Sequence, residues 1–382
     1  MPKVVSLPDL FAETFAAFPA KGANVAAKSD KTLKLAVIGL GIGRNHLKDY
    51  QGYDRSEVVA VCDKNAGRLK ERGEAAGIPA ERCYSDYKKL LRDAKELGLD
   101  AVSVAVPNAL HAPVTVAAAK AGLHVLCEKP MAMNAREARR MMRTADEAGT
   151  KLMINFSFRF TDQSQALKRL AESGAVGDIY YGRTVWHRRR GLPGFGGWFG
   201  QKELAGGGPI IDLGVHRLDL ALWLMGNPKP VTVSASTYGA IGPKLAKKQR
   251  KKFDVEDLGC ALVRFDNDAT LIVEASWAGF SEKKEDMVTQ LWGTTGGIIQ
   301  RNLAEGYTFE ALAYSEKDGA LWESRLQQPL EKSPSAYRAF VDAVLDDTPL
   351  PAPAEHGLGV QLILDAIYKS AQRGREVKIP KR

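Results

Sequence analysis

Residues 33–46 read LKLAVIGLGIGRNH. The first seven form a short apolar run that ends in glycine, which is typical of a β-strand buried on both faces. Gly39 permits a tight turn, Gly41 lets the backbone approach a pyrophosphate, and the N-terminus of a following helix presents free N–H groups to it. The segment predicts a dinucleotide-binding turn, although Arg44 stands where the G-x-G-x-x-G spacing has its third glycine. The predicted cofactor-binding residues of this turn are Gly39, Gly41, Ile42, Gly43 and Arg44.

A second apolar run, Val58–Asp63, ends in an acidic residue that lies twenty positions after Gly43. A carboxylate at this place binds the ribose diol of the adenosine, which favours NAD over NADP. Lys64 and Arg68 follow directly and could accept a 2′-phosphate, so NADP stays possible.

Short apolar runs continue to alternate with helical segments up to about residue 156. Such alternation predicts a parallel sheet with helices on both faces, that is, an α/β Rossmann domain. The predicted strands are Leu33–Gly39, Val58–Asp63, Ala101–Pro107, Leu123–Glu128 and Lys151–Phe156. The predicted helices are Leu47–Tyr50, Ala66–Ala76, Tyr87–Leu97, Ala112–Ala121 and Ala135–Ala148.

The pattern changes after about residue 159, where strands with alternating polarity are separated by longer loops. This pattern predicts an antiparallel sheet in an α+β domain, followed by a return to helix. The predicted strands are Ile179–Trp186, Val231–Thr237, Cys260–Phe265 and Thr270–Trp277, and the predicted helices are Ala336–Leu345 and Gly357–Ala371.

Composition excludes several classes of protein. The chain has 382 residues, 45% of them hydrophobic and 26% charged, and no run of about 18 apolar residues, so no membrane span is expected. Its four cysteines are scattered without a Cys/His cluster, which argues against a zinc site or a disulfide framework and favours the cytoplasm. The formal net charge is +9, and six of the basic residues lie close together within residues 244–252. A solvated loop explains that run better than a nucleic-acid surface, since no aromatic residues interleave it.

Residues 1–31 differ from the rest and form an N-terminal extension. Leu7–Phe18 could form a short amphipathic helix, and no secretory signal is recognisable. The extension is either a disordered tail or an arm that docks on another subunit.

Two short motifs carry candidate chemistry. Glu128-Lys129-Pro130 ends the fourth predicted strand, where ligands of open parallel sheets bind. Asp212 and His216 are four residues apart on a predicted helix, and so share one face. This pair could be a metal pair, an acid–base pair or a surface pair. The preceding Gly206-Gly207-Gly208 lacks side chains, which would let a substrate come close.

The loop over residues 186–200, WHRRRGLPGFGGWFG, precedes that helix. Its glycines, together with Phe195, Trp198 and Phe199, predict a lid with aromatic surfaces for a sugar. An ordinary surface loop is the alternative.

Taken together, these motifs resemble the glucose–fructose oxidoreductase, inositol dehydrogenase and rhizopine catabolism family (Gfo/Idh/MocA). The resemblance rests on GxGxGRxH, Pro107-Asn108 with His111, Glu128-Lys129-Pro130 and GGGxxxDxGxHxxD, and it runs from Leu33 to about Lys378. It implies a Rossmann domain over residues 32–155 and an α+β domain with an open, mostly antiparallel sheet over 156–335. It further implies a C-terminal helical segment, 336–382, that returns toward the nucleotide-binding domain.

The resemblance also implies roles for individual residues. The implied catalytic residues are Lys129, Asp212 and His216, and no metal is needed because the lysine supplies positive charge. Pro107, Asn108, His111, Glu128 and Lys129 would line the cofactor side. Arg159, Trp198, Asp212 and His216 would contact substrate.

The expected activity is that of an NAD(P)-dependent dehydrogenase that oxidises a secondary hydroxyl of a sugar, glycoside or cyclitol. His216, with an ordinary pKa of ~6.5, would accept the proton, and Asp212 would orient it or bind a second hydroxyl. Lys129 would stabilise the forming alkoxide. An NAD-dependent glycosidase and a non-catalytic NAD sensor are the alternatives.

The expected partners are a small polyol or sugar and a second copy of the chain, in a homodimer or homotetramer through the open sheet face. Neither nucleic acid nor a membrane is expected.

Overall fold

A computed structural model describes residues 30–328 and 332–380. The helix predicted over residues 7–18 therefore lies outside the described residues, as does nearly all of the N-terminal extension.

The first half of the chain forms a six-stranded parallel sheet with the strand order β3-β2-β1-β4-β5-β6. Its strands are β1 (Leu33–Ile38), β2 (Ser56–Cys62), β3 (Cys83–Tyr84), β4 (Ala101–Val104), β5 (His124–Cys127) and β6 (Leu152–Ile154). The Rossmann prediction is confirmed, and only the two-residue β3 was missed. Because β1 and β4 are neighbours and the chain leaves them in opposite directions, their carboxyl ends form the crevice where such sheets bind ligands.

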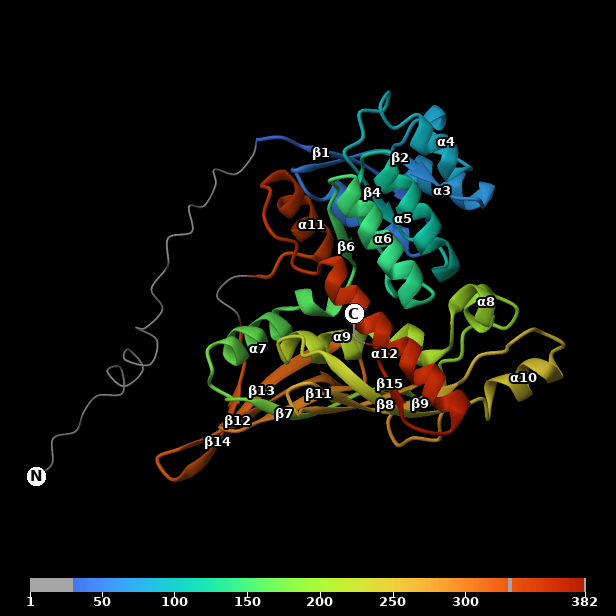
Figure 1. The fold of residues 1–382 in the computed structure, drawn as a ribbon. Coiled ribbons are helices and arrows are strands. Elements are labelled where there is room, and N and C mark those ends of the chain that lie inside the picture. The colour runs from blue at the N-terminus through green and yellow to red at the C-terminus, as the bar shows by residue number, and fades with distance from the viewer. Residues whose placement is uncertain (1–29, 329–331, 381–382) are drawn as a thin grey trace, which may run out of the picture.

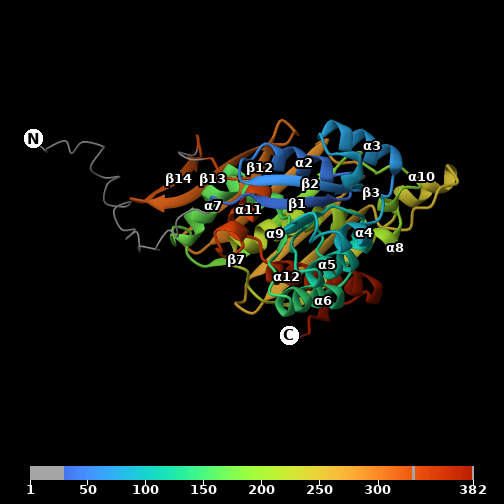
Figure 2. The same ribbon diagram turned by 90° about the horizontal axis from the view of Figure 1, so that it is seen from above.

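Helices cover both faces of this sheet. Figure 2 shows α2 and α3 on one side of β1 and β2, with α5 and α6 on the other. The helices are α2 (Gly43–Gln51), α3 (Ala66–Ala75), α4 (Tyr87–Arg92), α5 (His111–Lys120) and α6 (Ala135–Glu147). The start of α6 is fixed by Asn134, whose side chain accepts from the Glu137 N–H at 3.0 Å. The predicted helix over residues 87–97 ends early, at Arg92.

The second half forms a nine-stranded sheet with the order β14-β13-β12-β11-β7-β10-β9-β8-β15. All neighbouring pairs are antiparallel except β7 and β10, as the mostly antiparallel prediction requires. The four predicted strands are β7 (Ile179–Arg188), β8 (Pro230–Tyr238), β9 (Leu258–Phe265) and β10 (Thr270–Ser276). Strands that the sequence analysis missed are β11 (Glu285–Gly293), β12 (Gly296–Leu303), β13 (Thr308–Lys317), β14 (Ala320–Arg325) and β15 (Val377–Lys378).

Helices pack against one face of this second sheet, between it and the Rossmann domain (Figure 1). They are α7 (Asp162–Glu172), α9 (Val215–Leu224) and α12 (Ala354–Arg373). Among the described residues, no helix covers the opposite face, so the sheet is open there. The C-terminal helix α12 contacts both α6 and β8, and α11 (Ala336–Leu345) packs against α2. The closing helical segment thus ties the two sheets together.

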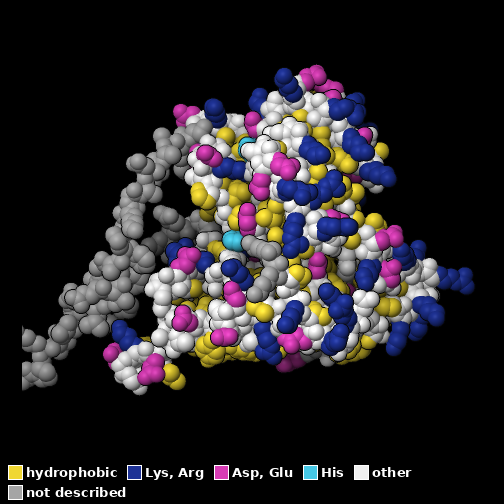
Figure 3. Space-filling view, viewed as in Figure 1, with side chains coloured by type: hydrophobic (Ala, Val, Ile, Leu, Met, Phe, Trp, Pro, Cys, Tyr) yellow, Lys and Arg dark blue, Asp and Glu magenta, His cyan; other side chains and the backbone are white. Residues whose placement is uncertain are grey.

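The basic run over residues 244–252 is exposed at one edge of the molecule, where Figure 3 shows Lys and Arg side chains gathered. It is not wholly a loop as expected, because α10 (Gly242–Lys248) occupies its first half. Lys252 pairs with Glu203 and Asp254, which offsets part of the charge.

All four cysteines are free. Within residues 30–328 and 332–380, no helix has the length and hydrophobicity needed to cross a membrane.

Candidate active site

A cleft of about 1430 Å³ lies between the two sheets. The ends of β1, β2, β4 and β5 line one side, and residues from β7, α9 and the β12–β13 turn line the other. This volume exceeds the ~300–1,000 Å³ of a typical single-ligand pocket. The cleft can therefore hold two ligands side by side.

The glycine-rich turn forms the floor of the nucleotide end. Gly39 has φ +92°, and a Cβ there would lie 2.4 Å from the Ala105 carbonyl oxygen, so only glycine fits. A Cβ on Gly41 would meet only the Arg68 guanidinium, at 3.8 Å, which leaves the backbone open to a ligand. A Cβ on Gly43 would lie 3.0 Å from Val37 Cγ1, so this residue provides the close helix–strand packing expected of a third glycine.

The N-terminus of α2 is open to an anion. Ile42 at its N-cap makes no side-chain cap, and the first turn carries no acidic residue. Arg44 is exposed and lines the cleft. These features fit the phosphates of a dinucleotide, because free N–H groups and the positive end of the helix dipole face the cleft.

Asp63 is held rigidly at the end of β2. One carboxylate oxygen accepts from the Leu40 N–H at 2.7 Å, and the other from the Asn65 N–H at 2.8 Å. The Arg68 guanidinium lies 3.2 Å away and is 42% exposed. Asp63 lines the cleft, as a residue that binds the ribose must, and the partly exposed Arg68 guanidinium lies directly beside it.

The other predicted cofactor-side residues also line the cleft. Asn108 donates to the Ala205 carbonyl oxygen at 2.8 Å, which links the Rossmann domain to α8 (Lys202–Ala205), the short helix before Asp212. His111 is fully buried, with its ring nitrogens 2.7 Å from the Pro130 oxygen and 2.9 Å from the Val106 oxygen. Burial lowers the pKa of His111.

Glu128 belongs to a buried network beneath the centre of the cleft. Its Oε1 lies 3.0 Å from His46 Nε2 and accepts from Asn155 Nδ2 at 2.6 Å. Burial alone would raise the Glu128 pKa, but the His46 hydrogen bond and charge, together with the Lys129 charge, bring it below its usual value. Asn155 also contacts Tyr337, and both line the cleft. Sequence reasoning did not identify these two residues.

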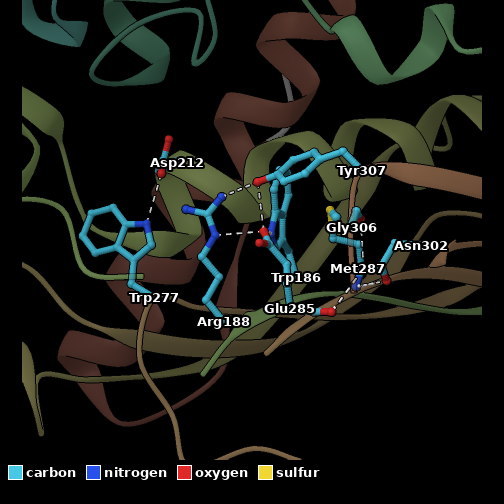
Figure 4. A network of polar contacts seen from close by, with 9 residues as sticks. All are labelled: Trp186, Arg188, Asp212, Trp277, Glu285, Met287, Asn302, Gly306 and Tyr307. Carbon is cyan, nitrogen blue, oxygen red and sulfur yellow. Dashed lines mark hydrogen bonds and ion pairs between the residues drawn. The ribbon is translucent and has the colours of Figure 1, made fainter. Parts of the chain in front are cut away.

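Lys129 and Asp212 meet directly across the domain boundary. The Lys129 Nζ lies 2.9 Å from the Asp212 carbonyl oxygen and 3.1 Å from its Oδ1. The other carboxylate oxygen of Asp212 accepts from Trp277 Nε1 at 3.0 Å (Figure 4). Trp277, which is 1% exposed and was not recognised in the sequence, fixes the carboxylate from below.

His216 lines the same part of the cleft, between aromatic side chains. Its ring centroid is 5.1 Å from that of Phe158 and 5.8 Å from that of Trp186. Its Nδ1 is shielded from solvent without a hydrogen-bond partner among the described residues. Burial, with the charges of Lys129, Arg217 and Arg188, lowers the His216 pKa well below its usual value. The His216 pKa therefore lies below the ~6.5 of an unperturbed imidazole.

The structure does not show the Asp212–His216 contact that one of the two expected roles of Asp212 requires, and its binding of a second substrate hydroxyl stays a prediction. Within the described residues, the Asp212 carboxylate bonds to Lys129 and Trp277, and no hydrogen bond joins it to the imidazole. One physical reason is the local backbone, since residues Ile210–Gly214 form a π-helical turn before α9 begins at Val215. A wider turn changes the angle between side chains four residues apart.

Close packing, rather than room for a substrate, accounts for two of the three glycines before this turn, Gly207 and Gly208. A Cβ on Gly207 would lie 2.0 Å from the Tyr368 hydroxyl, and one on Gly208 would lie 2.1 Å from the Glu256 backbone carbonyl oxygen. Glu256 accepts from the Gly208 N–H at 2.9 Å and from Tyr368 at 2.7 Å. These close contacts anchor the segment that carries Asp212.

Arg159 is not a substrate residue. It is 1% exposed and forms a buried ion pair with Asp219, with its Nε 2.8 Å from the carboxylate. It also approaches His356 at 2.8 Å. The Arg159 guanidinium is bonded to these partners and does not line the cleft, so the prediction that Arg159 contacts substrate was wrong.

Aromatic side chains also line the cleft. Trp198 stacks on Phe199 with centroids 4.0 Å apart, and both line the cleft, where the lid was predicted. Phe158, Trp186 and Tyr307 line it as well. Within the described ranges, no group of three His, Cys, Asp or Glu residues could hold a metal ion. Independence of metal stays a prediction.

Comparisons with known proteins agree with this geometry. Residues 33–156 match the family described as "Oxidoreductase family, NAD-binding Rossmann fold" (GFO_IDH_MocA), and residues 164–299 match the GFO/IDH/MocA C-terminal domain. A D-glucoside 3-dehydrogenase of Escherichia coli (strain K12) is 32% identical over 364 residues, which cover 93% of this chain and 99% of that protein.

Solved structures share the fold. The aldose-aldose oxidoreductase from Caulobacter crescentus, complexed with glycerol, has a TM-score of 0.77 at 27% identity, covering 91% of this chain and 100% of its own. GenD2 from gentamicin A biosynthesis, in complex with NAD, has a TM-score of 0.76 at 26% identity, covering 93% and 99%. This chain therefore belongs to the Gfo/Idh/MocA family of oxidoreductases, with an NAD-binding Rossmann domain.

Proposed function

We propose that the protein is an NAD(P)-dependent dehydrogenase that oxidises a secondary hydroxyl of a sugar, glycoside or cyclitol. One observation carries the proposal. The ion pair of Lys129 with Asp212 and the imidazole of His216 line the same cleft as the nucleotide cradle. The relatedness to a D-glucoside 3-dehydrogenase supports a carbohydrate substrate.

The reaction separates a hydride from carbon and a proton from oxygen. NAD, when bound, supplies the hydride acceptor. The Lys129 ammonium donates a hydrogen bond to the reacting oxygen and stabilises its developing negative charge. Asp212 holds this ammonium in place from two sides, through its carbonyl and its carboxylate.

His216 accepts the hydroxyl proton. Its lowered pKa keeps the imidazole neutral throughout the neutral pH range, so it is always ready to accept. The same shift makes it a weaker base, and the positive charge of Lys129 compensates by acidifying the hydroxyl. A fixed ammonium gives this activation without a metal, and we propose a metal-free reaction.

Asp63 supports NAD as the preferred cofactor. Its carboxylate is fixed by two backbone N–H groups at the ribose end and would repel a 2′-phosphate. Arg68, which pairs with it and is partly exposed, could swing to bind that phosphate. NADP should therefore be used less efficiently.

A second copy of the chain would cover the open face of the large sheet. Half-exposed apolar side chains lie on this face in a single chain, beside the Arg183–Glu274 ion pair. A contiguous apolar surface of this kind marks a protein interface. Apolar side chains on this face include Tyr181, Leu262, Ile272, Val288 and Trp292. Light scattering after size exclusion should report a dimer or tetramer.

A panel of free sugars, glycosides and inositols with NAD⁺ or NADP⁺ tests the activity. Formation of NADH together with a keto product would support it. Release of an aglycone without net NADH would favour the NAD-dependent glycosidase, and cofactor binding without turnover of any compound would favour a sensor.

A further inference from the structure

Tyr307 is the most exposed aromatic side chain that lines the cleft. It lies just after β12, in the turn that leads to β13, and is 59% exposed. Trp186, whose ring centroid is 6.1 Å from that of Tyr307, is only 3% exposed and also contacts the His216 ring. The aromatic lining thus runs from a deep part beside His216 to a shallow part at Tyr307.

The Tyr307 side chain is clamped through its hydroxyl. It accepts from the Arg188 guanidinium at 2.6 Å and donates to Glu285 at 3.0 Å (Figure 4). The same Glu285 oxygen accepts from Trp186 Nε1 at 2.7 Å and from Arg188 Nε at 2.9 Å. One carboxylate therefore fixes the deep and the shallow aromatic side chains relative to each other.

The turn that carries Tyr307 is also held in a defined shape. Ala304 and Glu305 adopt φ values of +47° and +55°, which non-glycine residues rarely adopt. The Asn302 side chain donates to the carbonyl oxygens of Glu285 and Gly306, both at 3.1 Å, and accepts from the Met287 N–H at 2.9 Å. Strained residues that are held this firmly often lie at binding sites.

These contacts build a rigid aromatic surface beyond the reacting groups. The hydroxyl is engaged by protein partners, so the ring is what Tyr307 presents. Partial burial raises the Tyr307 pKa above its usual value, so the phenol stays neutral. The C–H groups of a sugar ring or the edge of an aromatic aglycone pack favourably on such a face.

We propose that Tyr307 forms an outer subsite for a second ring, so that the substrate is a glycoside rather than a free monosaccharide or cyclitol. The first ring, which is oxidised, lies beside Lys129 and His216. The glycosidic substituent lies against Tyr307 at the open end. This inference rests on the proposed function, and it names the substrate class.

Phenyl glucoside, a glucose disaccharide and free glucose are the probes that test the subsite. Binding to the enzyme with NADH is measured by calorimetry, and turnover is measured with NAD⁺. Tyr307→Ala should lower the affinity for the two glycosides about tenfold and should lower kcat/KM by the same factor, mainly by raising KM. The reason is that an aromatic contact is worth up to ~1.5 kcal/mol. Free glucose should change by less than about twofold.

Tyr307→Phe and Tyr180→Ala are the comparison variants. The first keeps the ring and should retain most glycoside binding. The second truncates a tyrosine that is 54% exposed outside the cleft and should change nothing. Equal affinity of wild type and Tyr307→Ala for the glycosides, an equal loss for free glucose, or no glycoside binding at all would overturn the subsite. Tyr307-dependent binding without oxidation would uphold it and refute the dehydrogenase.

Discussion

Removal of the Lys129 ammonium tests the centre of the proposed chemistry. Its Nζ lies within 3.1 Å of two Asp212 oxygens, and the side chain is 15% exposed, so it is fixed and largely shielded. An alkoxide that forms about 4 Å from this charge would gain about 4 kcal/mol at an effective dielectric constant of ~20. Since about 1.4 kcal/mol of barrier is a factor of ten in rate, Lys129→Ala should lower kcat about 10³-fold.

Absorbance of NADH at saturating cofactor measures this loss, and NADH fluorescence checks that the cofactor still binds. Lys120→Ala, at the exposed end of α5, is the matched control and should leave kcat unchanged. The Asp212→Asn substitution should lower kcat much less in the Lys129→Ala variant than in the wild-type enzyme, because the two residues act as one unit. If kcat falls by less than tenfold while NADH still binds, the role of the ammonium is refuted.

Further variants test the rest of the site. His216 must be neutral to act, and its pKa is lowered, so the acidic limb of the kcat/KM profile should lie well below pH ~6.5; an unchanged limb in His216→Ala would move the base elsewhere. Trp277→Phe removes one bond to Asp212 and should reduce kcat up to about tenfold with little change in KM, whereas a change in KM alone would contradict a positioning role. Asp63→Ala should narrow the preference for NAD over NADP, and a wild-type preference for NADP would overturn that assignment. Asp219→Ala should lower the free energy of unfolding in urea by about 3–5 kcal/mol, because the buried Arg159 charge loses its partner; a loss below ~1 kcal/mol would contradict this.

The nucleotide half of the site was predictable because its determinants are local. The glycine turn and α2 follow one another within a few residues, so their spacing fixes their geometry. Asp63 ends the neighbouring strand, and β1 pairs in parallel with β2, which brings it to the turn. The alternating pattern predicted a parallel sheet, in which the carboxyl ends of the strands lie at one edge.

The errors have a different physical cause. The Arg159 position in a motif said nothing about its contacts, and its burial depends on Asp219, sixty residues later. Gly207 and Gly208 suggested room for a substrate, yet the Tyr368 side chain of α12 and the Glu256 residue before β9 fill the space beside them. Neither partner could be identified until the packing of distant elements was known.

The substrate half depends on strand register that local patterns do not encode. Trp277 follows β10 and reaches Asp212 because the turn over Ile210–Gly214 packs against β10. Tyr307 reaches Arg188 across 119 residues because β11 and β12 bring the turn to the cleft. Strands β11 to β14 mix polar and apolar residues, so their pairing was not apparent. The proposed hydride chemistry rests on Lys129, which follows a strand of the Rossmann sheet, whereas the proposed subsite rests on Tyr307, on a turn of the second sheet. The two proposals together assign the hydride chemistry to the first sheet and the choice of substrate to the second.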